Sequence, residues 1–226
     1  MRADFFYCNV VFWILFLMIS IHSPAQSPTS PLKELSPGVF QIGRVRLNVK
    51  QKTVQFPASI NMTNGLVEYL LVTGTGKLHE SVLKTEVDPA QIHIAMLFLG
   101  ARVATNAFGT NICGEKIEIA IRSIAENPEP VSAEELVFND KTKLPMKPEG
   151  WIYNGSKVVD GTFIAQRDGS IVSIITDPLA LANSRQVDRD NDEIWFVNTN
   201  TISPVNSKVE VTFKMESAKK IPHDPK

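Results

Sequence analysis

Short segments with alternating apolar residues recur along most of this chain. Lys116–Arg122 (KIEIAIR) alternates without a break, and 208–215 (KVEVTFKM) does the same near the other end. Alternation with a period of two places apolar side chains on one face of a β-strand. Strands alternating regularly with helices are absent from the pattern, as is a nucleotide-binding glycine motif. The sequence therefore predicts a predominantly antiparallel β-sheet, with a hairpin turn at Arg167–Gly169 joining two of its strands.

One segment, at about 89–99, has the end signals of a helix. Asp88 fits the N-cap, Pro89 fits the first helical position, and Gly100 follows as a stop signal. Apolar residues leave the segment almost no polar face, so we expect this helix to be buried against the sheet. A second short helix is expected at about 178–183. The predicted fold class is therefore α+β.

The first residues have the features of a secretory signal peptide. An apolar run from about 10 to 21 precedes Ser23 and Ala25, which are small residues at the positions that signal peptidase reads. We therefore predict a signal peptide over 1–25 and export of the rest. The alternative is an uncleaved membrane anchor, because the apolar stretch is at the short limit for crossing a bilayer.

The remaining chain divides into three parts by composition. Residues 26–37 are rich in Ser and Pro and are expected to form a flexible spacer. Residues 38–216 carry the expected strands and helices and are predicted to form a single globular domain. Residues 217–226 are expected to form a polar tail.

Charge and cysteine content narrow the possible partners. The formal net charge is −1 at pH 7, and no strongly basic segment is present, so a nucleic-acid partner is not expected. Removal of the signal would leave Cys113 as the single cysteine, which excludes an internal disulfide. We expect that thiol to be buried as a small hydrophobic group.

The segment 72–89 brings together side chains that can carry chemistry. Lys77, His79, Glu80 and Ser81 fall within five positions, directly after a glycine-rich turn. If residues 78–87 are the return arm of a hairpin, Lys77, His79 and Ser81 share one face of a strand. Glu80 then lies on the other face. These four residues are the candidate binding region.

Catalytic and structural interpretations both fit this region. His79 could activate Ser81 as the nucleophile of a hydrolase, which would need an oxyanion hole and an orienting acid from elsewhere. His79 and Glu80 could instead hold a metal ion with His93 or an aspartate, although the spacing matches no compact metal signature. The structural interpretation is that His79 and Glu80 form hydrogen bonds within the hairpin. His93 alone fits a core histidine with a hydrogen-bond partner.

An acidic stretch offers a weaker metal site. Asp188, Asp190 and Asp192 alternate as at the start of a calcium-binding loop. The glycine needed at the sixth position is replaced by Glu193, and the closing glutamate by Thr199, so the EF-hand pattern fails. A solvated acidic loop is the simpler interpretation, and a weak Ca²⁺ site is the alternative. No other cofactor is predicted.

Several of these segments resemble the YdjY-domain family of exported bacterial proteins. The likeness lies in GLVEYLLV, GKLHESVL and PAQIHIAMLFLGA, and later in WIYNGS, ITDPLAL and DNDEIWFVN. It covers most of the chain after about Ser36, so 38–216 is expected to be one YdjY-like domain. The resemblance implies a periplasmic or cell-envelope location and supplies no reaction. A four-cysteine iron–sulfur cluster is excluded, because the mature chain would hold one cysteine.

Together these features favour a non-catalytic domain that binds a ligand or partner in the bacterial envelope. The expected partner is another envelope protein or a small ligand, with membrane contact only through an uncleaved signal. The alternative is an envelope hydrolase that uses His79 and Ser81, alone or with a metal ion.

Overall fold

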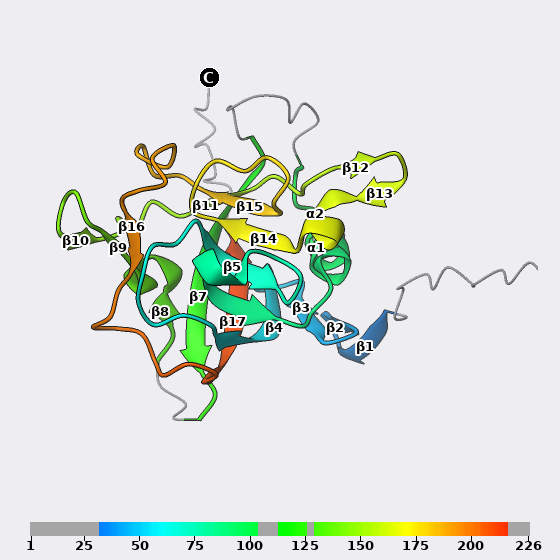
Figure 1. The fold of residues 1–226 in the computed structure, drawn as a ribbon. Coiled ribbons are helices and arrows are strands. Elements are labelled where there is room, and N and C mark those ends of the chain that lie inside the picture. Colours follow the sequence, from blue (N-terminus) through cyan, green and yellow to red (C-terminus); the bar gives the residue numbers. More distant parts are fainter. Residues whose placement is uncertain (1–31, 104–112, 126–128, 217–226) are drawn as a thin grey trace, which may run out of the picture.

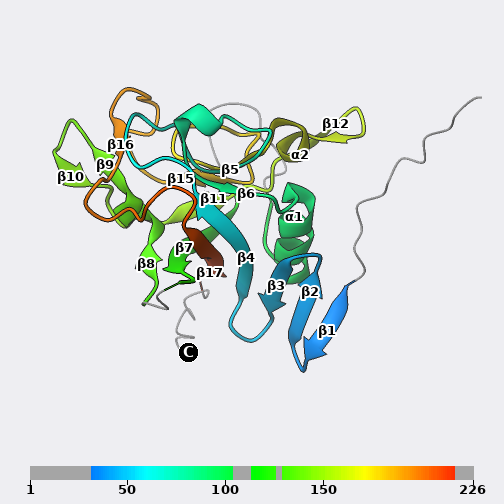
Figure 2. The same cartoon turned by 60° about the horizontal axis from the view of Figure 1, so that its bottom comes forward.

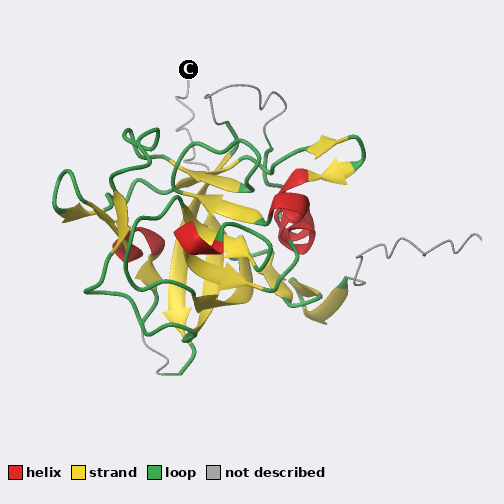
Figure 3. Cartoon of the chain, viewed as in Figure 1, coloured by secondary structure: helices red, strands yellow, loops and turns green. Residues whose placement is uncertain are grey.

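The computed structural model describes residues 32–103, 113–125 and 129–216. The predicted signal peptide, the first half of the predicted spacer and the predicted polar tail lie outside these residues. The described chain is mostly β-strand with two α-helices (Figure 3), so the α+β class is confirmed.

The elements follow one another in short steps along the chain. The strands are β1 (Lys33–Ser36), β2 (Val39–Ile42), β3 (Val45–Asn48), β4 (Thr53–Ile60), β5 (Tyr69–Thr73), β6 (Ser81–Thr85), β7 (Glu115–Ser123), β8 (Val131–Ser132), β9 (Val137–Asn139), β10 (Leu144–Pro145), β11 (Trp151–Tyr153), β12 (Val158–Val159), β13 (Thr162–Phe163), β14 (Ser170–Ser173), β15 (Ala182–Ser184), β16 (Trp195–Val197) and β17 (Lys208–Met215). The helices are α1 (Pro89–Phe98) and α2 (Ile164–Asp168), with short 3-10 turns η1 (Leu78–Glu80) and η2 (Ala133–Leu136).

Eight strands close into a barrel. They follow the order β4-β17-β7-β11-β15-β14-β5-β6, and β6 pairs back onto β4. Strands β1 to β3 extend from β4 as a flap beside α1 (Figures 1 and 2). The pairs β5–β6 and β14–β15 are parallel. The sheet is thus mixed and closed, which corrects the simple antiparallel prediction, because alternation specifies the faces of a strand and not its neighbours.

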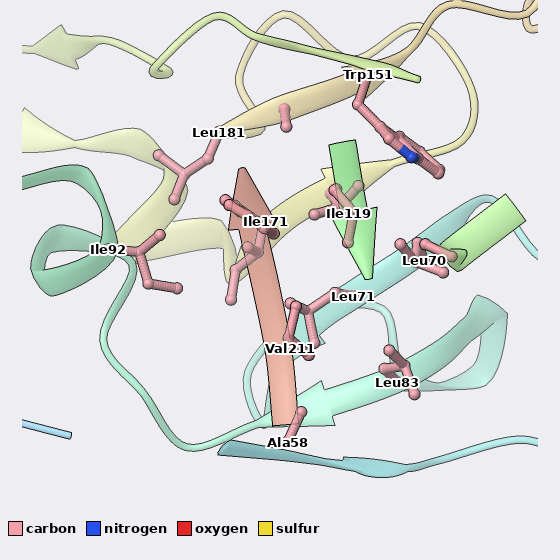
Figure 4. Packing of buried hydrophobic residues seen from close by; sticks show 14 of the residues in the cluster. Ala58, Leu70, Leu71, Leu83, Ile92, Ile119, Trp151, Ile171, Leu181 and Val211 are labelled. Carbon is pink, nitrogen blue, oxygen red and sulfur yellow. The ribbon is translucent and has the colours of Figure 1, made fainter. Parts of the chain in front are cut away.

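The barrel interior is filled by the apolar positions of the alternating strands. On β17, Val209, Val211 and Phe213 are buried, whereas the residues between them are partly exposed. The ring of Phe213 meets the ring of Phe56 edge-on, with 5.3 Å between centroids. Figure 4 shows Val211 gathered with other buried side chains between the strands. The period-two pattern of the sequence therefore encodes the core directly.

Helix α1 lies on the outside of the barrel and not within it. Its bounds confirm the prediction, but only one face is covered, where it packs on β3, β4 and α2. Ile92 is fully buried, whereas Ile94, Leu97 and Phe98 are 39–46% exposed. The expectation of a helix buried against the sheet holds for one face only, because a helix on the outer surface of a barrel has neighbours on one side only.

The predictions of a hairpin turn at 167–169 and of a second helix at 178–183 are also corrected. The hairpin turn expected at 167–169 is instead the end of α2, which stops at Gly169 with φ +71°. The helix expected at 178–183 does not form, because the chain turns there and enters β15. Asn183 Nδ2 donates to Asn154 Oδ1 and to the Asp177 carbonyl, both at 2.8 Å. These buried bonds, with strand pairing on both sides of β15, replace helical hydrogen bonds.

Two smaller expectations are wrong as well. Strand β1 lies inside the predicted spacer 26–37 and pairs with β2, so ordered structure begins before residue 38. Cys113 is exposed and not buried. It stands just before β7, where the chain has not yet entered the barrel wall.

Candidate functional site

The candidate residues lie in the connection between β5 and β6. These two strands run parallel, so residues 78–87 are not the return arm of a hairpin. The connection is held from outside by Asn61, whose Nδ2 donates to the carbonyls of Leu78 (2.6 Å) and Ser81 (2.8 Å). A Cβ on Gly76 would lie 2.7 Å from the Cβ of Val72, so only glycine fits there. The same Cβ would lie 3.0 Å from the Gly169 carbonyl oxygen, so Gly76 permits the close approach of two backbone segments.

Three of the four candidate residues form a charged network. Lys77 Nζ lies 2.5 Å from Glu68 Oε2 and 3.4 Å from Glu80 Oε2. His79 Nε2 lies 3.7 Å from Glu80 Oε1. The hydrogen bond that Lys77 donates to Glu68 raises the pKa of Lys77 above its usual value. The Lys77 ammonium also stands 5.6 Å from the centre of the Tyr69 ring.

This arrangement corrects the grouping expected from a strand. A 3-10 turn brings positions i and i+3 onto the same side, which places Glu80 beside Lys77. Ser81 is separated from the network. Its side chain is fully buried, and its Oγ donates to the Lys77 carbonyl at 2.5 Å.

His79 and Ser81 do not form a nucleophile–base pair. The His79 side chain is 77% exposed, and the hydroxyl of Ser81 is engaged by backbone. In the described part of the chain no hydrogen bond joins the two side chains. Ser81 therefore has a structural role here, and the His79 side chain lies at the surface.

A pocket of about 580 Å³ opens beside this connection, at the seam of the barrel. Strand β3 pairs with β4 up to Gln55, and β6 pairs with Ser59 and Ile60. Within the described chain, no strand lies along the same edge of β4 at residues 56–58, where Thr85 Oγ1 donates to the Pro57 carbonyl at 2.6 Å. The pocket occupies this gap.

The predicted region contributes one wall of the pocket, but not through its charged residues. Gly74 and Leu78 line the pocket, whereas Lys77, His79, Glu80 and Ser81 do not. The polar lining comes instead from Arg44, Lys84, Lys208 and neighbouring residues on other strands. Sequence reasoning missed these lysines, because each is only one of many polar positions in an alternating strand. Their meeting depends on the register of β4 with β6 and β17.

Residues 45–214 match the family model of the YdjY domain. The chain belongs to the YdjY-domain family. The match runs from β3 nearly to the end of β17, so it includes every strand of the barrel. No curated protein and no solved structure matched the chain. Among the described residues of this YdjY domain, no helix is long and apolar enough to cross a membrane.

His93 of the YdjY domain is a packed histidine on α1. Its Nδ1 lies 2.7 Å from the Tyr153 hydroxyl, and its ring stands 5.0 Å from the ring of Phe163. Burial lowers the pKa of His93 and raises that of Tyr153. Both groups are therefore held neutral, which agrees with the expected core histidine.

The acidic stretch of the YdjY domain is a surface turn. Asp188, Asp190 and Asp192 are exposed, and Asp190 Oδ1 accepts a hydrogen bond from Thr176 Oγ1 at 2.5 Å. No group of three or more His, Cys, Asp or Glu side chains within the described ranges is arranged to hold a metal ion. Calcium binding at these aspartates stays a prediction.

Proposed function

We propose that this YdjY domain is an exported protein of the bacterial envelope that binds a ligand in the pocket at the barrel seam, without catalysing a reaction. The observation that carries the proposal is the pocket itself, which occupies the gap between β3 and β6 along one edge of β4. Ligand sites are typically concave and largely pre-formed, and this pocket is a concave site between paired strands.

Binding without catalysis is favoured over hydrolysis by the state of the two candidate catalytic groups. Ser81 is buried and hydrogen-bonded to backbone, and His79 is exposed, with Glu80 Oε1 3.7 Å from its Nε2. A nucleophile needs a base within hydrogen-bond reach. The export part of the proposal is supported by the apolar run that ends before Ser23 and Ala25.

The pocket can be blocked without disturbing the fold. Gly74 lines the pocket, and a Cβ built there meets nothing within 4 Å and needs no left-handed backbone. Gly74→Phe should therefore fill the pocket with a ring. We expect compounds that bind the purified protein, detected by ligand-observed NMR of a mixed small-molecule library, to lose binding in this variant.

The control introduces the same aromatic ring at the neighbouring residue. Thr75 is exposed and does not line the pocket, so Thr75→Phe should leave binding unchanged. Equal binding to the wild type and Gly74→Phe would refute the proposed site. A library that yields no binder at all would refute the binding function.

Hydrolysis is tested on the same protein. Ester, phosphate and glycan substrates would be supplied to the wild type, His79→Ala and Ser81→Ala, with melting curves recorded for each. We expect no turnover by any of the three. Turnover by the wild type that is lost in both folded variants would replace the binding proposal with the hydrolase.

Export is tested by the mass of the protein recovered from the envelope fraction of a bacterial host. We expect a chain that begins at Gln26, and a full-length chain retained with the membrane when Ala25 is replaced by Lys. Recovery of the uncut wild-type chain from the cytoplasm would contradict export.

A further inference from the structure

The floor of the pocket carries three polar side chains in one row. Ser59 on β4 is paired with Lys84 on β6 and, on its other side, with Lys208 on β17. Residues directly opposite one another in antiparallel strands point to the same face of a sheet. All three residues line the pocket, so this face is the one that opens to it.

The spacing lets both lysines reach one ligand. Neighbouring strands lie about 4.8 Å apart, so the two lysine Cα atoms flank Ser59 across roughly 10 Å. Each ammonium is carried on a flexible four-carbon stem, which can bend toward the middle of the row. An anion above Ser59 is therefore within reach of two positive charges and one hydroxyl.

Neither lysine is neutralised by the protein. Among the described residues, Lys84 and Lys208 have no carboxylate within ion-pair distance, and the Ser59 hydroxyl has no hydrogen-bond partner. The acids nearby are already paired. Glu86 Oε2 lies 3.3 Å from Arg44 Nη1, and Glu210 Oε1, beside the adjoining hollow, lies 2.7 Å from Arg122 Nη2. The row thus keeps an uncompensated positive charge inside a concave surface, which attracts anions.

We propose that the row Lys84–Ser59–Lys208 binds the phosphate group of a small phosphorylated molecule. The inference rests on the proposed binding function and names the class of its ligand. A dianionic phosphate accepts hydrogen bonds on several oxygens at once, which suits two ammonium groups and a hydroxyl placed around it. The pocket volume of about 580 Å³ and the apolar walls at Leu78 and Pro57 leave room for an organic group attached to the phosphate.

The state of Arg44 favours phosphate over carboxylate. A planar carboxylate gains most from the two-pronged guanidinium of arginine, whereas a phosphate is bound both by that fork and by the point charge of lysine. The two terminal nitrogens of Arg44 already face Glu86, because Nη1 binds Glu86 Oε2 and Nη2 donates to the Glu86 carbonyl at 2.6 Å. The charges left free in the pocket are lysines, which act as point charges.

The experiment is a calorimetric titration of the purified protein with phenyl phosphate. Inorganic phosphate, benzoate and phenol are titrated in parallel, so that a free phosphate, a carboxylate and the bare ring are distinguished from a phosphate ester. We expect phenyl phosphate to bind at least tenfold more tightly than benzoate or phenol, and inorganic phosphate to bind the same row more weakly. Raising the salt concentration should weaken binding.

The variants locate the site. Lys84→Gln and Lys208→Gln should each weaken phenyl phosphate binding about tenfold, as expected for loss of one charge-assisted hydrogen bond. Ser59→Ala should weaken it by a smaller factor. Lys50→Gln is the matched control. Lys50 is exposed in the turn before β4, at the opposite end of that strand from Ser59, and its loss should change binding less than twofold.

The outcomes separate this inference from the proposed function. Some compounds could bind the wild type and lose binding in Gly74→Phe, and yet bind equally well with a phosphate or a carboxylate and without either lysine. That result would overturn the phosphate assignment and leave the pocket as the binding site. Phenyl phosphate binding that is unchanged in both lysine variants would also overturn it. Absence of any pocket binder would overturn both proposals.

Discussion

At the scale of single residues, Lys77 is the centre of the charged network beside Tyr69. Its ammonium compensates Glu68, whose side chain is only 12% exposed, and also approaches the more exposed Glu80. A carboxylate that is mostly removed from water needs such a partner, because its desolvation is not otherwise repaid. Lys77 therefore stabilises the connection between β5 and β6 independently of the pocket nearby.

Replacement of this ammonium should destabilise the fold. Lys77→Met is expected to lower the free energy of unfolding by about 1–2 kcal/mol, because Glu68 loses its cation while Lys77 itself is half-exposed. Urea denaturation measures the change. Lys143→Met removes a fully surface pair with Asp140 and should cost less than about 0.5 kcal/mol. Equal losses in the two variants would show that Glu68 does not depend on Lys77.

His93 should make stability depend on pH in a defined window. Burial lowers its pKa below the ordinary value of 6.5, so the unfolded chain takes up a proton at a higher pH than the folded chain does. The contribution of neutral His93 is fully present above pH 6.5 and declines as the pH falls below it, by at most about 1.4 kcal/mol per pH unit.

The variant His93→Gln isolates this effect. Glutamine can still face the Tyr153 hydroxyl but does not titrate, and Tyr153 itself stays neutral over this range. The difference in unfolding free energy between wild type and variant, measured from pH 8 to 5, should change only below about 6.5. A difference that is flat across the range would contradict the burial of His93.

At the scale of elements, α1 shows what the sequence can predict and what it cannot. Its bounds were predictable, because Asp88, Pro89 and Gly100 are local signals that depend on the helix alone. Its exposed side was not, because that depends on where the barrel ends. The relative direction of β5 and β6 was not predictable either, because their apolar pattern fits a hairpin and a parallel pair equally well.

The candidate site also has a part that the sequence could predict and a part that it could not. The charged network at Lys77 and Glu80 was predictable in part, since the residues are neighbours in sequence. The row formed by Ser59, Lys84 and Lys208 was not, since these residues are distant in sequence and meet only through strand register. Sequence reasoning locates local clusters and misses sites that the sheet assembles.

The two faces of α1 give a direct test at this scale. Ile92 is fully buried and Ile94 is 39% exposed, although they stand two residues apart in the same helix. Ile92→Ala should cost about 2–5 kcal/mol through lost contacts and a cavity, whereas Ile94→Ala should cost less than about 1 kcal/mol. Thermal and urea unfolding of both variants measures the difference. Similar costs would place Ile94 in an interface that buries it.

At the scale of the whole molecule, the barrel depends on its last strand. Strand β17 lies between β4 and β7 and pairs with both along nearly its entire length. The wall therefore joins an early strand, a middle strand and the final strand. Without β17, both β4 and β7 would present open edges, which favour aggregation.

Removal of this strand should abolish folding. A chain that ends at Ser207 is expected to lose its cooperative thermal transition and to form aggregates, because the barrel cannot close. A chain that ends at Glu216 removes only residues after β17 and should unfold as the full chain does. Circular dichroism melts and size-exclusion chromatography compare the two. A cooperative transition in the shorter chain would show that the other strands form a stable core by themselves.

The central place of β17 has a consequence for the export proposed above. Contacts between segments far apart in sequence form slowly, and here the wall is incomplete until the final strand is available. A chain emerging from the ribosome would thus stay unfolded until synthesis is nearly finished. That delay would suit the proposed export, because a translocation channel admits an extended polypeptide, and the barrel of an exported chain would then close on the far side of the membrane.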